Sequence, residues 1–455
     1  MLTRILGVVA LGIGLAVVPA LGQGVSVATF VIDATPPMGS PLCGGGVEPA
    51  SAVDDPLSAR GIAILPEGQS PIVLCSVDWV GIGNGGHDAW RQALAEAAGT
   101  TIDRVAVHTV HQHDAPSCDF TNSEILAANG LAGKSFNVEF ARDTISRAAA
   151  ALREALKAPR PVNQVGIGQA KVEMVASNRR VLGPDGKVKY IRWTATKDPE
   201  ARACPEGTID PMVKLVSLWD GETPVVVLSY YATHPQSHYG KGHVSSDIPG
   251  LARAAREQEL PGTVLIHFNG AGGNITSGKY NDGAPENRPV LVGRLAEGMK
   301  KAWEATVKSP LNAASVKWTT KDVTLPLRKE ISEEYETNRL KDPNAKENER
   351  LISADVLSWL QTQKAGSKIT LSRLTLGTAD IMHMPGELFI EYQLAAQDMK
   401  KDAFVCMAAY GNYGPGYICT AIAYTQGGYE DGIYASLTAP EVEPVLMDAM
   451  RELLQ

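Results

Sequence analysis

The chain has 455 residues, and 42 Lys and Arg against 50 Asp and Glu give it a net charge of −8. An acidic chain without a basic stripe is not suited to hold nucleic acid. With 44% hydrophobic and 20% charged residues, the composition is that of an ordinary globular protein and excludes disorder as the main state. The length allows more than one domain, but no repeat, linker or shift in composition marks a boundary.

The N-terminus has the pattern of an export signal. Arg4 precedes an almost unbroken apolar run over residues 5–18, and Pro-Ala-Leu-Gly at 19–22 supplies a helix break and small residues. The run is shorter than the about 20 residues that a membrane-spanning helix needs. We therefore expect a signal peptide over residues 1–23, export to the periplasm or the medium, and no later membrane-spanning segment. The mature domain is predicted at 24–455.

Strands and helices alternate along the mature chain. In chain order, apolar and β-branched runs predict strands at 25–33, 62–65, 72–80 and 105–110, and helical spacing predicts helices at 87–98 and 136–156. Further strands are expected at 172–176, 213–219, 225–231 and 264–268, and helices at 248–260 and 290–307. The strand at 25–33 alternates like an edge strand, and Pro184-Asp185-Gly186 predicts a hairpin between Arg180 and Ile191. This alternation predicts an α/β fold in which helices cover a mixed sheet.

Residues 330–363 are dense in charge, with Lys, Glu, Asp and Arg interspersed with leucines. We expect one or two surface helices there, as a charged helical insertion at about 328–365 in the mature domain. Two roles are open for this segment. It is either a plain solvated helix pair or a lid that covers a site.

The six cysteines are Cys43, Cys75, Cys118, Cys204, Cys406 and Cys419. None forms a CxxC pair, so a thiolate metal site is not indicated. An exported chain can form disulfides, but the spacing does not decide which cysteines pair. We interpret these residues as buried or bridged rather than as nucleophiles.

The histidines are concentrated in two clusters, of which the first is His108, His111 and His113. Side chains alternate along an extended segment, so His111 and His113 face the same side. An HxH pair at the end of a strand can present two imidazoles to one metal, and imidazoles without thiolates favour zinc. A structural role for the same histidines is an equal alternative.

The second cluster, His234, His238 and His243, follows the strand predicted at 225–231. A catalytic zinc needs about three protein ligands and one open position. Glu387, after a Pro-Gly turn, supplies a carboxylate that would complete such a set. The alternative for Glu387 is a carboxylate near a helix N-terminus, where the helix dipole favours it.

A glycine-rich loop follows the strand predicted at 264–268. Its glycine spacing does not match GxGxxG, so nucleotide binding is not indicated. Glycines let the backbone pass close to a ligand, and the exposed amides of residues 269–278 could hold a developing oxyanion.

Taken in order, these segments resemble the neutral ceramidase family. The likeness is carried by Asp33-Ala-Thr-Pro-Pro-Met-Gly39, Val110-His111-Gln-His113-Asp-Ala-Pro116, Asn178-Arg179, His234, Ser245-Ser-Asp247-Ile-Pro-Gly250, Gly273-Asn-Ile-Thr276-Ser-Gly278, Pro385-Gly386-Glu387, and Tyr417-Ile-Cys-Thr420 with Tyr424 and Tyr429-Glu430. Single motifs of this kind are weak, but six in the family's order are strong. The likeness covers the family's N-terminal catalytic domain alone, and its C-terminal immunoglobulin-like domain is not expected here.

The resemblance implies an exported zinc-dependent hydrolase that cuts an amide bond of an N-acyl, ceramide-like substrate through a metal-activated water. The zinc ligands that it implies are His111, His234, Glu387 and Tyr417. It also implies that His113 and Arg179 lie beside the metal and contact the scissile group or its developing charge. His113 is expected to give a proton to the leaving amine.

The sequence departs from the family near the expected site. Asp114 stands where the family has serine, which would place an extra carboxylate beside the metal. Thr276 stands where the family often has serine, which weakens a nucleophilic-serine mechanism. Asp247 and Asn274 are expected in the loops around the ligands, with Asp247 orienting a ligand or capping a helix. Ceramide itself is therefore one option, and another N-acyl amide or an ester is the alternative.

Two further interpretations are open. A zinc hydrolase of another class, such as a metallo-β-lactamase-like enzyme, would use His-x-His-x-Asp, but here Asp114 follows His113 directly. A periplasmic protein that binds a metal or a ligand without turnover is the other.

Overall fold

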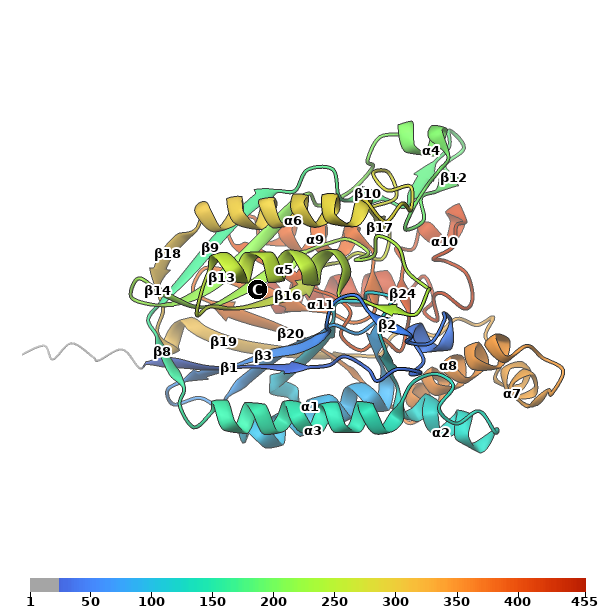
Figure 1. Ribbon diagram of the computed structural model, residues 1–455, viewed down its shortest axis with the longest axis horizontal. Coiled ribbons are helices and arrows are strands. Elements are labelled where there is room, and N and C mark those ends of the chain that lie inside the picture. Colours follow the sequence, from blue (N-terminus) through green and yellow to red (C-terminus); the bar gives the residue numbers. More distant parts are fainter. Residues whose placement is uncertain (1–23) are drawn as a thin grey trace, which may run out of the picture.

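The computed structural model describes residues 24–455, and the signal peptide expected at 1–23 lies outside the described residues. Three larger β-sheets and the helices that cover them form this part of the chain (Figure 1). The α/β class with helix-covered mixed sheets is thereby confirmed. Over residues 24–455, no helix combines the length and the apolar character that a membrane span requires.

Each larger sheet contains one parallel pair of strands among antiparallel neighbours. The first has the order β6 (Val105–Thr109), β4 (Ile72–Val77), β3 (Ser58–Pro66), β1 (Val25–Asp33) and β8 (Arg160–Val162). The second has the order β16 (Val264–Asn269), β14 (Thr223–Tyr231), β13 (Met212–Asp220), β9 (Gln164–Lys171) and β18 (Val307–Pro310). The third has the order β19 (Val316–Val323), β20 (Ile369–Leu376), β21 (Ala379–His383) and β23 (Phe404–Ala408). The parallel pairs are β4–β6, β14–β16 and β21–β23.

The three sheets share one central core because successive side chains of a strand point to opposite faces. In β4, Ile72 and Leu74 enter this shared core, whereas Val73 and Cys75 face the helices outside the first sheet. All six residues of β4 are buried. Burial of both faces explains why the sequence reads here as an unbroken apolar run.

Helices cover the outer face of each sheet. The first sheet carries α1 (Asn84–Ala98) and α3 (Val138–Ala155), the second α5 (Asp247–Glu259) and α6 (Asn287–Glu304), and the third α9 (Ile390–Met399) and α11 (Val442–Leu454). Figure 1 shows α5 and α6 along one side of the molecule and α1 and α3 along the opposite side. On α3, Ala141, Ile145, Ala148 and Leu152 are buried at spacings of three and four, the pattern of a helix with one apolar face.

Short strands and helices gather at one end of the molecule, where Figure 1 shows β2, β10, β17 and β24. The two-stranded sheets pair β2 (Ala52–Val53) with β15 (His243–Val244), β5 (Gly81–Ile82) with β7 (Ser117–Cys118), β10 (Ser177–Asn178) with β17 (Ile275–Thr276), β11 (Arg180–Leu182) with β12 (Val188–Ile191), and β22 (Glu387–Leu388) with β24 (Tyr417–Ile418). The short helices are α2 (Phe120–Ala128), α4 (Pro199–Ala203) and α10 (Ala423–Gln426). The expected hairpin is confirmed, since Arg180 lies opposite Ile191.

Two strand predictions are wrong. Residues 172–176 form no strand, and the strand of this region is β9, directly before them. Gly166 and Gly168 interrupt its apolar pattern. A Cβ at Gly168 would lie 2.1 Å from the carbonyl oxygen of Ala302, so glycine is required for α6 to pack closely. The strand β1 is not an edge strand, because it pairs with β3 along its length and with β8 at its start.

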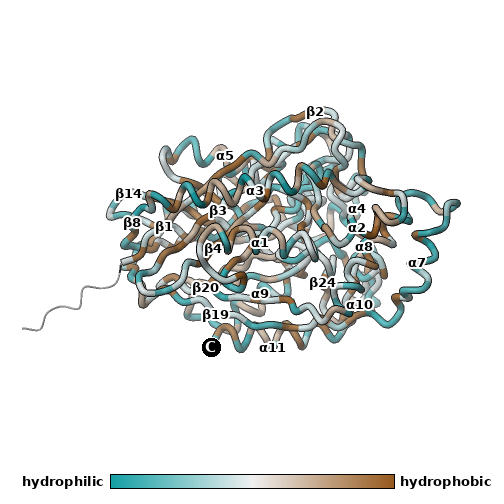
Figure 2. Tube along the Cα trace, turned by 90° about the horizontal axis from the view of Figure 1, so that it is seen from below, coloured by the Kyte–Doolittle hydropathy of each residue, from teal (hydrophilic) through white to brown (hydrophobic). Residues whose placement is uncertain are grey.

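The charged segment forms two helices, α7 (Glu333–Lys341) and α8 (Glu347–Lys364). Figure 2 shows α7 as a mostly hydrophilic segment. On α8, however, Leu351, Trp359 and Leu360 are buried in the core of the third sheet. The segment is therefore not a plain solvated helix pair, since one face of α8 is part of the protein interior.

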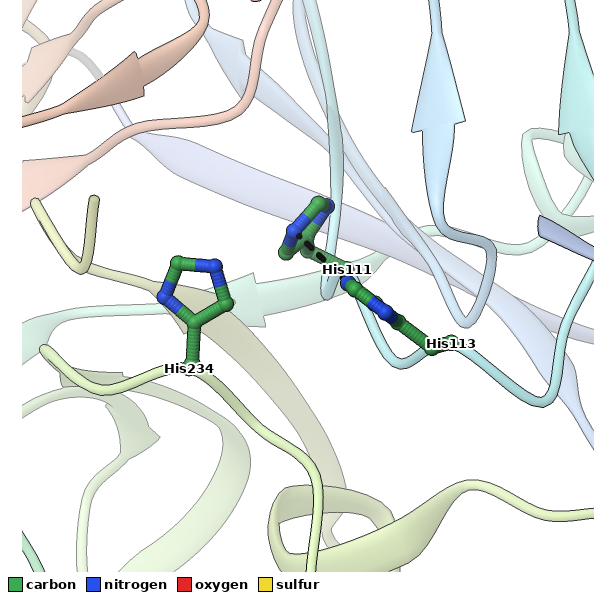
Figure 3. A group of neighbouring side chains, drawn as sticks. All are labelled: His111, His113 and His234. Atoms are coloured by element: carbon green, nitrogen blue, oxygen red, sulfur yellow. Dashed lines mark hydrogen bonds between the residues drawn. The ribbon is translucent and has the colours of Figure 1, made fainter. Parts of the chain in front are cut away.

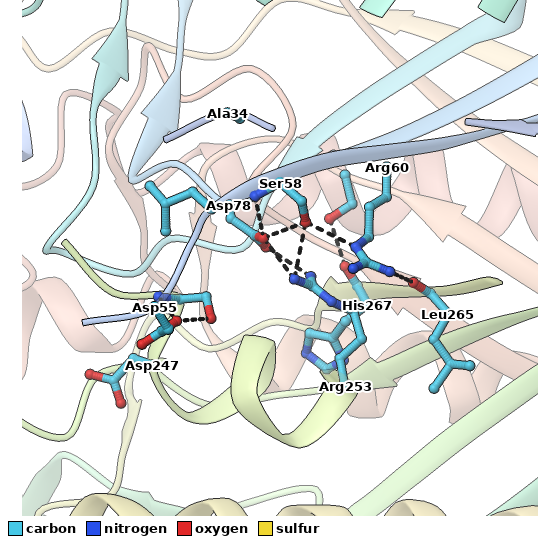
Figure 4. A network of polar contacts seen from close by, with 12 residues as sticks. Ala34, Asp55, Ser58, Arg60, Asp78, Asp247, Arg253, Leu265 and His267 are labelled. Atoms are coloured by element: carbon cyan, nitrogen blue, oxygen red, sulfur yellow. Dashed lines mark hydrogen bonds and ion pairs between the residues drawn. The ribbon is translucent and has the colours of Figure 1, made fainter. Parts of the chain in front are cut away.

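A buried ion pair joins α5 to the first sheet (Figure 4). Both guanidinium Nη atoms of Arg253 donate to the carboxylate of Asp78, at 2.8 and 2.7 Å. Ser58 donates to the same carboxylate from its backbone N and from Oγ, at 2.8 and 2.7 Å. Burial works to raise the pKa of Asp78, but Arg253 outweighs it and holds that pKa below its ordinary value. The pair fixes α5, whose first residue lies next to the loop that follows β14.

Candidate metal centre

The predicted ligands follow the carboxyl ends of strands that belong to the parallel pairs. His111 and His113 follow β6, His234 follows β14, Glu387 follows β21 and Tyr417 follows β23. All three large sheets therefore contribute to one place. The carboxyl ends of parallel strands are where open α/β sheets bind their ligands.

His111 is held in one orientation from two sides. Its φ is 74°, in the left-handed region that non-glycine residues rarely adopt. The ring stacks on Tyr410 with centroids 4.6 Å apart, and Nδ1 lies 2.6 Å from the carbonyl oxygen of Val80. Because a carbonyl oxygen only accepts, Nδ1 carries a proton, and in the neutral ring Nε2 is the nitrogen that presents a lone pair.

His234 is oriented in the same way by the glycine-rich loop. Its Nδ1 lies 2.7 Å from the carbonyl oxygen of Gly272 and 3.1 Å from that of Ile275, so Nδ1 again carries the proton. Gly272 itself packs closely, since a Cβ there would lie 3.0 Å from the Tyr410 hydroxyl. Burial, with the positive charge of Arg179 nearby, lowers the pKa of His234 to about 4. The imidazole is therefore neutral at pH 7.

Glu387 brings its carboxylate to both histidines. Its Oε2 lies 3.2 Å from His111 Nε2 and 3.0 Å from His234 Nε2, and the side chain is only 2% exposed. Its Oε1 accepts a hydrogen bond of 2.7 Å from the hydroxyl of Tyr413.

These atoms fit a metal ion better than they fit one another. The two Nε2 atoms present lone pairs, and Oε2 of Glu387 has no hydrogen-bond donor among the described residues. Electron-rich atoms that approach within 3.2 Å repel unless a cation lies among them. Neutral imidazole and ionised carboxylate are also the forms that metals bind. The group that His111, His234 and Glu387 form can therefore hold a metal.

Tyr417 and Arg179 complete one side of this group. The Tyr417 hydroxyl lies 3.1 Å from His234 Nε2 and accepts a hydrogen bond of 2.9 Å from Arg179 Nη1. Arg179 also lies 3.6 Å from Glu430. Burial works to lower the pKa of Arg179, but Tyr417 and Glu430 outweigh it and raise that pKa, so the guanidinium stays charged. In the described structure its Nε has no acceptor.

His113 lies beside His111, and His234 faces both from another segment (Figure 3). The Nε2 atom of His113 is 3.3 Å from His111 Nε2, and each of the three imidazoles offers one ring nitrogen within 4.8 Å of those of the other two. Burial, with His111 and His234 nearby, lowers the pKa of His113 well below its ordinary value. A neutral imidazole in this position suits either a further ligand or a group that moves a proton beside the metal.

Asp114 and Asp247 hold the loop after His234 and do not join the group of imidazoles. Asp114 Oδ1 accepts a hydrogen bond of 2.8 Å from the amide of Gly240. Asp247, with a φ of 46°, accepts one of 3.0 Å from the amide of Ser237, and burial raises its pKa to about 6. The extra carboxylate at position 114 thus ties two loops together.

Asn274 and Thr276 are structural in this fold. Asn274 Oδ1 accepts from the amide of Ile390 at 2.8 Å, and Thr276 Oγ1 donates to the carbonyl oxygen of Trp193 at 2.8 Å. Asn274 therefore fixes the start of α9, three residues after Glu387. Thr276 fixes the end of the glycine-rich loop.

The expectation that the backbone amides of the glycine-rich loop hold an oxyanion is wrong for three of these amides, because they already donate to acceptors within the protein. Ala271, Gly273 and Ile275 donate their amides to Gln393 Oε1, Leu388 O and Gly272 O. The loop acts through its carbonyl oxygens instead, because they orient His234.

The other histidines and the cysteines lie outside the group. His108 pairs with His383 at 3.0 Å in a separate buried contact, and His243 pairs with Asp54 near the surface. Within residues 24–455 all six cysteines are free. They are therefore not bridged. Four of them are buried, which agrees with the interpretation of the cysteines as buried rather than bridged.

The group opens into a cavity of about 290 Å³. His113, Glu387 and Tyr417 line one end of it, and Cys43 lies on its wall. Burial raises the pKa of Cys43 to about 12, so its thiol is neither a ligand nor a nucleophile near pH 7.

No protein-family model and no curated protein matches the sequence. Two solved structures match the fold over 95% of this chain and 75% of theirs. A ceramidase complexed with C2 has 16% sequence identity and a TM-score of 0.67, and the neutral ceramidase from Pseudomonas aeruginosa has 15% identity and a TM-score of 0.65. This chain has the neutral ceramidase fold. The resemblance seen in the sequence is confirmed at that level, since identities this low establish fold alone.

Several parts of this ceramidase-fold centre could not be found from the sequence. The carbonyl oxygens of Val80 and Gly272 orient the two histidine rings, and any residue type can supply a carbonyl. Tyr413 lies near Tyr417 in sequence and donates a hydrogen bond to Glu387, but no sequence motif indicated this contact. Asn84, Asp119 and Asp355, which also line the cavity, come from three segments that are distant in sequence.

Proposed function

We propose that the chain is a zinc-dependent hydrolase that cleaves a linear amide bond of an N-acyl substrate. The observation that carries the proposal is the convergence of the Nε2 atoms of two buried imidazoles on one buried carboxylate oxygen that has no hydrogen-bond donor among the described residues, beside a cavity. The solved structures that share the fold are ceramidases, which supports an N-acyl, lipid-like substrate as the starting class.

His111, His234 and Glu387 would hold the ion, with Tyr417 as a further ligand. Imidazole and carboxylate ligands without a thiolate favour zinc, and a site of this kind leaves a position open for water or substrate. When bound, the ion supplies a Lewis acid that activates water near neutral pH and polarises a carbonyl group.

The neighbouring residues supply proton transfer and charge stabilisation. Neutral His113 can accept a proton from the attacking water at Nε2 and deliver it to the leaving nitrogen as the C–N bond breaks. Arg179 keeps a positive charge in a buried position and has an N–H without an acceptor. Such a group stabilises the negative charge that develops on the carbonyl oxygen.

Metal content and turnover test the proposal together. We expect purified protein to contain about one zinc per chain, to hydrolyse short- and long-chain N-acyl amides, and to lose this activity reversibly on chelation. Amide hydrolysis that persists in fully metal-free protein contradicts the proposal. Cleavage of esters but not amides would instead indicate an esterase, and bound zinc without turnover of either class would indicate a binding protein.

Replacing His113 with alanine separates its two possible roles. If His113 moves the proton, His113→Ala should keep wild-type zinc content while kcat/KM falls by about 100-fold or more. Added imidazole should restore part of the rate. Elemental analysis decides the outcome, because loss of zinc from this variant would make His113 a ligand.

We also propose that the protein acts in the periplasm or outside the cell. The support for this is the signal-peptide pattern of residues 1–23. N-terminal sequencing of the protein recovered from the periplasm or the medium should find a start near residue 24, and a start at Met1 would contradict export by cleavage.

A further inference from the structure

The wall of the cavity away from the metal centre is acidic. Asn84 at the start of α1, Asp119 before α2, and Asp355 on α8 line it together with Ser117 and Ser135. The same cavity reaches His113, Glu387 and Tyr417. A molecule whose scissile bond lies at the metal centre would therefore extend toward this wall.

The two carboxyl groups of this wall have no cationic partner. Asp119 accepts from Asn84 Nδ2 and Ser358 Oγ, both at 2.7 Å, and Asp355 Oδ1 accepts from Asn122 Nδ2 at 2.7 Å. No ion pair within residues 24–455 includes either carboxylate. The second oxygen of Asp355 receives no donor from the described chain and is accessible from the cavity.

Asn84 points to a missing ligand independently of the two carboxyl groups. Its side chain is 2% exposed, yet Oδ1 has no hydrogen-bond donor in the described structure. The amide orientation is fixed, because Nδ2 donates to Asp119 and to Ser358 Oγ at 2.9 Å. A buried oxygen without a donor costs about 1–3 kcal/mol unless something binds it.

Gly414 packs directly against this oxygen. A Cβ at position 414 would lie 2.4 Å from Asn84 Oδ1, and Gly414 lines the same cavity. The loop that carries Gly414 also reaches the metal centre, because the hydroxyl of the preceding residue, Tyr413, donates to Glu387. One short loop thus joins the Asn84 oxygen to the carboxylate of the metal centre.

The electrostatics agree with a missing cation. Asp355 is exposed to the cavity, and the negative charge of Asp119 works to raise its pKa. A carboxyl group that faces another negative charge gains affinity for a bound group that carries a positive charge.

We propose that this wall binds a primary ammonium group of the substrate, so that the enzyme prefers linear N-acyl amides with a free amine on the part that enters the cavity. An ammonium group has three N–H donors and no acceptor, which matches a wall that offers Asp355 Oδ2, Asn84 Oδ1 and the charge of Asp119. The substrate class rests on the proposed hydrolase function, whereas ammonium binding itself does not. This preference distinguishes the chain from an enzyme for uncharged ceramides.

Binding of a simple probe tests the wall without reference to activity. By calorimetry, n-hexylammonium should bind the full mature chain at least about tenfold more tightly than 1-hexanol. Asp355→Asn should remove this preference, and so should Gly414→Ala, which would place a Cβ 2.4 Å from Asn84 Oδ1. Glu347→Gln, an exposed charge change on the same helix, should leave it unchanged.

Turnover tests the substrate class. Between two N-acyl amides that differ only in a terminal ammonium or methyl group, the zinc-loaded wild type should favour the ammonium form about tenfold or more in kcat/KM. Asp355→Asn should lose that preference. Equal binding of hexylammonium and hexanol to folded wild type would overturn the proposal, and so would displacement of hexylammonium by equimolar Ca²⁺. If neither amide is cleaved while hexylammonium still binds, the proposed hydrolase function is contradicted and the proposed ammonium site is supported.

Discussion

His234→Ala is expected to remove the metal and to lower kcat/KM by at least about a thousandfold. His234 supplies one of the lone pairs that converge with Glu387, and loss of a residue that only orients a ligand already costs about 10- to 100-fold. The remaining group would be His111, Glu387 and Tyr417, of which the first two lie 3.2 Å apart. Zinc content by elemental analysis and turnover of an N-acyl amide measure the two effects.

His238→Ala is the matched control for this variant. It lies four residues further along the same loop, and within residues 24–455 its ring makes one hydrogen bond, of 3.4 Å with the Ser237 hydroxyl. Zinc content and kcat/KM should stay within about twofold of wild type, as for most substitutions outside such features. Full activity of His234→Ala with undiminished zinc would show that the ligands lie elsewhere.

Asp78→Ala is expected to lower the free energy of unfolding by about 3–5 kcal/mol, because Arg253 would be left as a buried charge without a partner. The folded-state pKa of Asp78 lies below its unfolded value. Its stabilisation is therefore complete above about pH 4 to 5, near and above the unfolded pKa, and is lost as the pH falls through the folded pKa. Urea unfolding of wild type and variant at pH 7 and at acid pH measures both effects, and the difference between the two proteins should shrink in acid.

Two comparisons show whether the buried ion pair is the cause. Asp143→Ala removes an exposed carboxylate that pairs with Arg147 on the surface, and should change stability by less than about 1 kcal/mol. The double variant Asp78→Leu with Arg253→Met should be more stable than either single variant, because it leaves no buried charge unpaired. Additive losses in the double variant would contradict the explanation.

Much of the fold was predictable because its strands are buried on both faces. The strands β4, β13, β14 and β16 gave long runs of Val, Leu and Ile, and the helices α3 and α6 gave one apolar face each. The predicted site residues His111, His113, His234, Glu387, Tyr417 and Arg179 lie together, since each follows a strand or loop at one end of the molecule. Their roles remain predictions.

The parts that were not predictable depend on packing. The strand β9 was missed because its glycines at 166 and 168 carry no apolar side chain; Gly168 allows the close approach of α6, and Gly166 that of Ser217, Trp219 and Thr306. The acidic wall was missed because residues 84, 119 and 355 are far apart in sequence and carry no motif. Asp114 was expected beside the metal from its position next to His113, but the amide of Gly240 turns its carboxylate to the neighbouring loop.

The carbonyl oxygens of Val80 and Gly272 have a consequence for how the centre tolerates mutation. Exchange of an amino acid changes a side chain and leaves the backbone acceptor in place, so no single substitution can delete either partner of the imidazole N–H groups. The orientation of both rings can therefore be retained while the surrounding sequence changes, which is compatible with a fold that is shared at only 16% sequence identity.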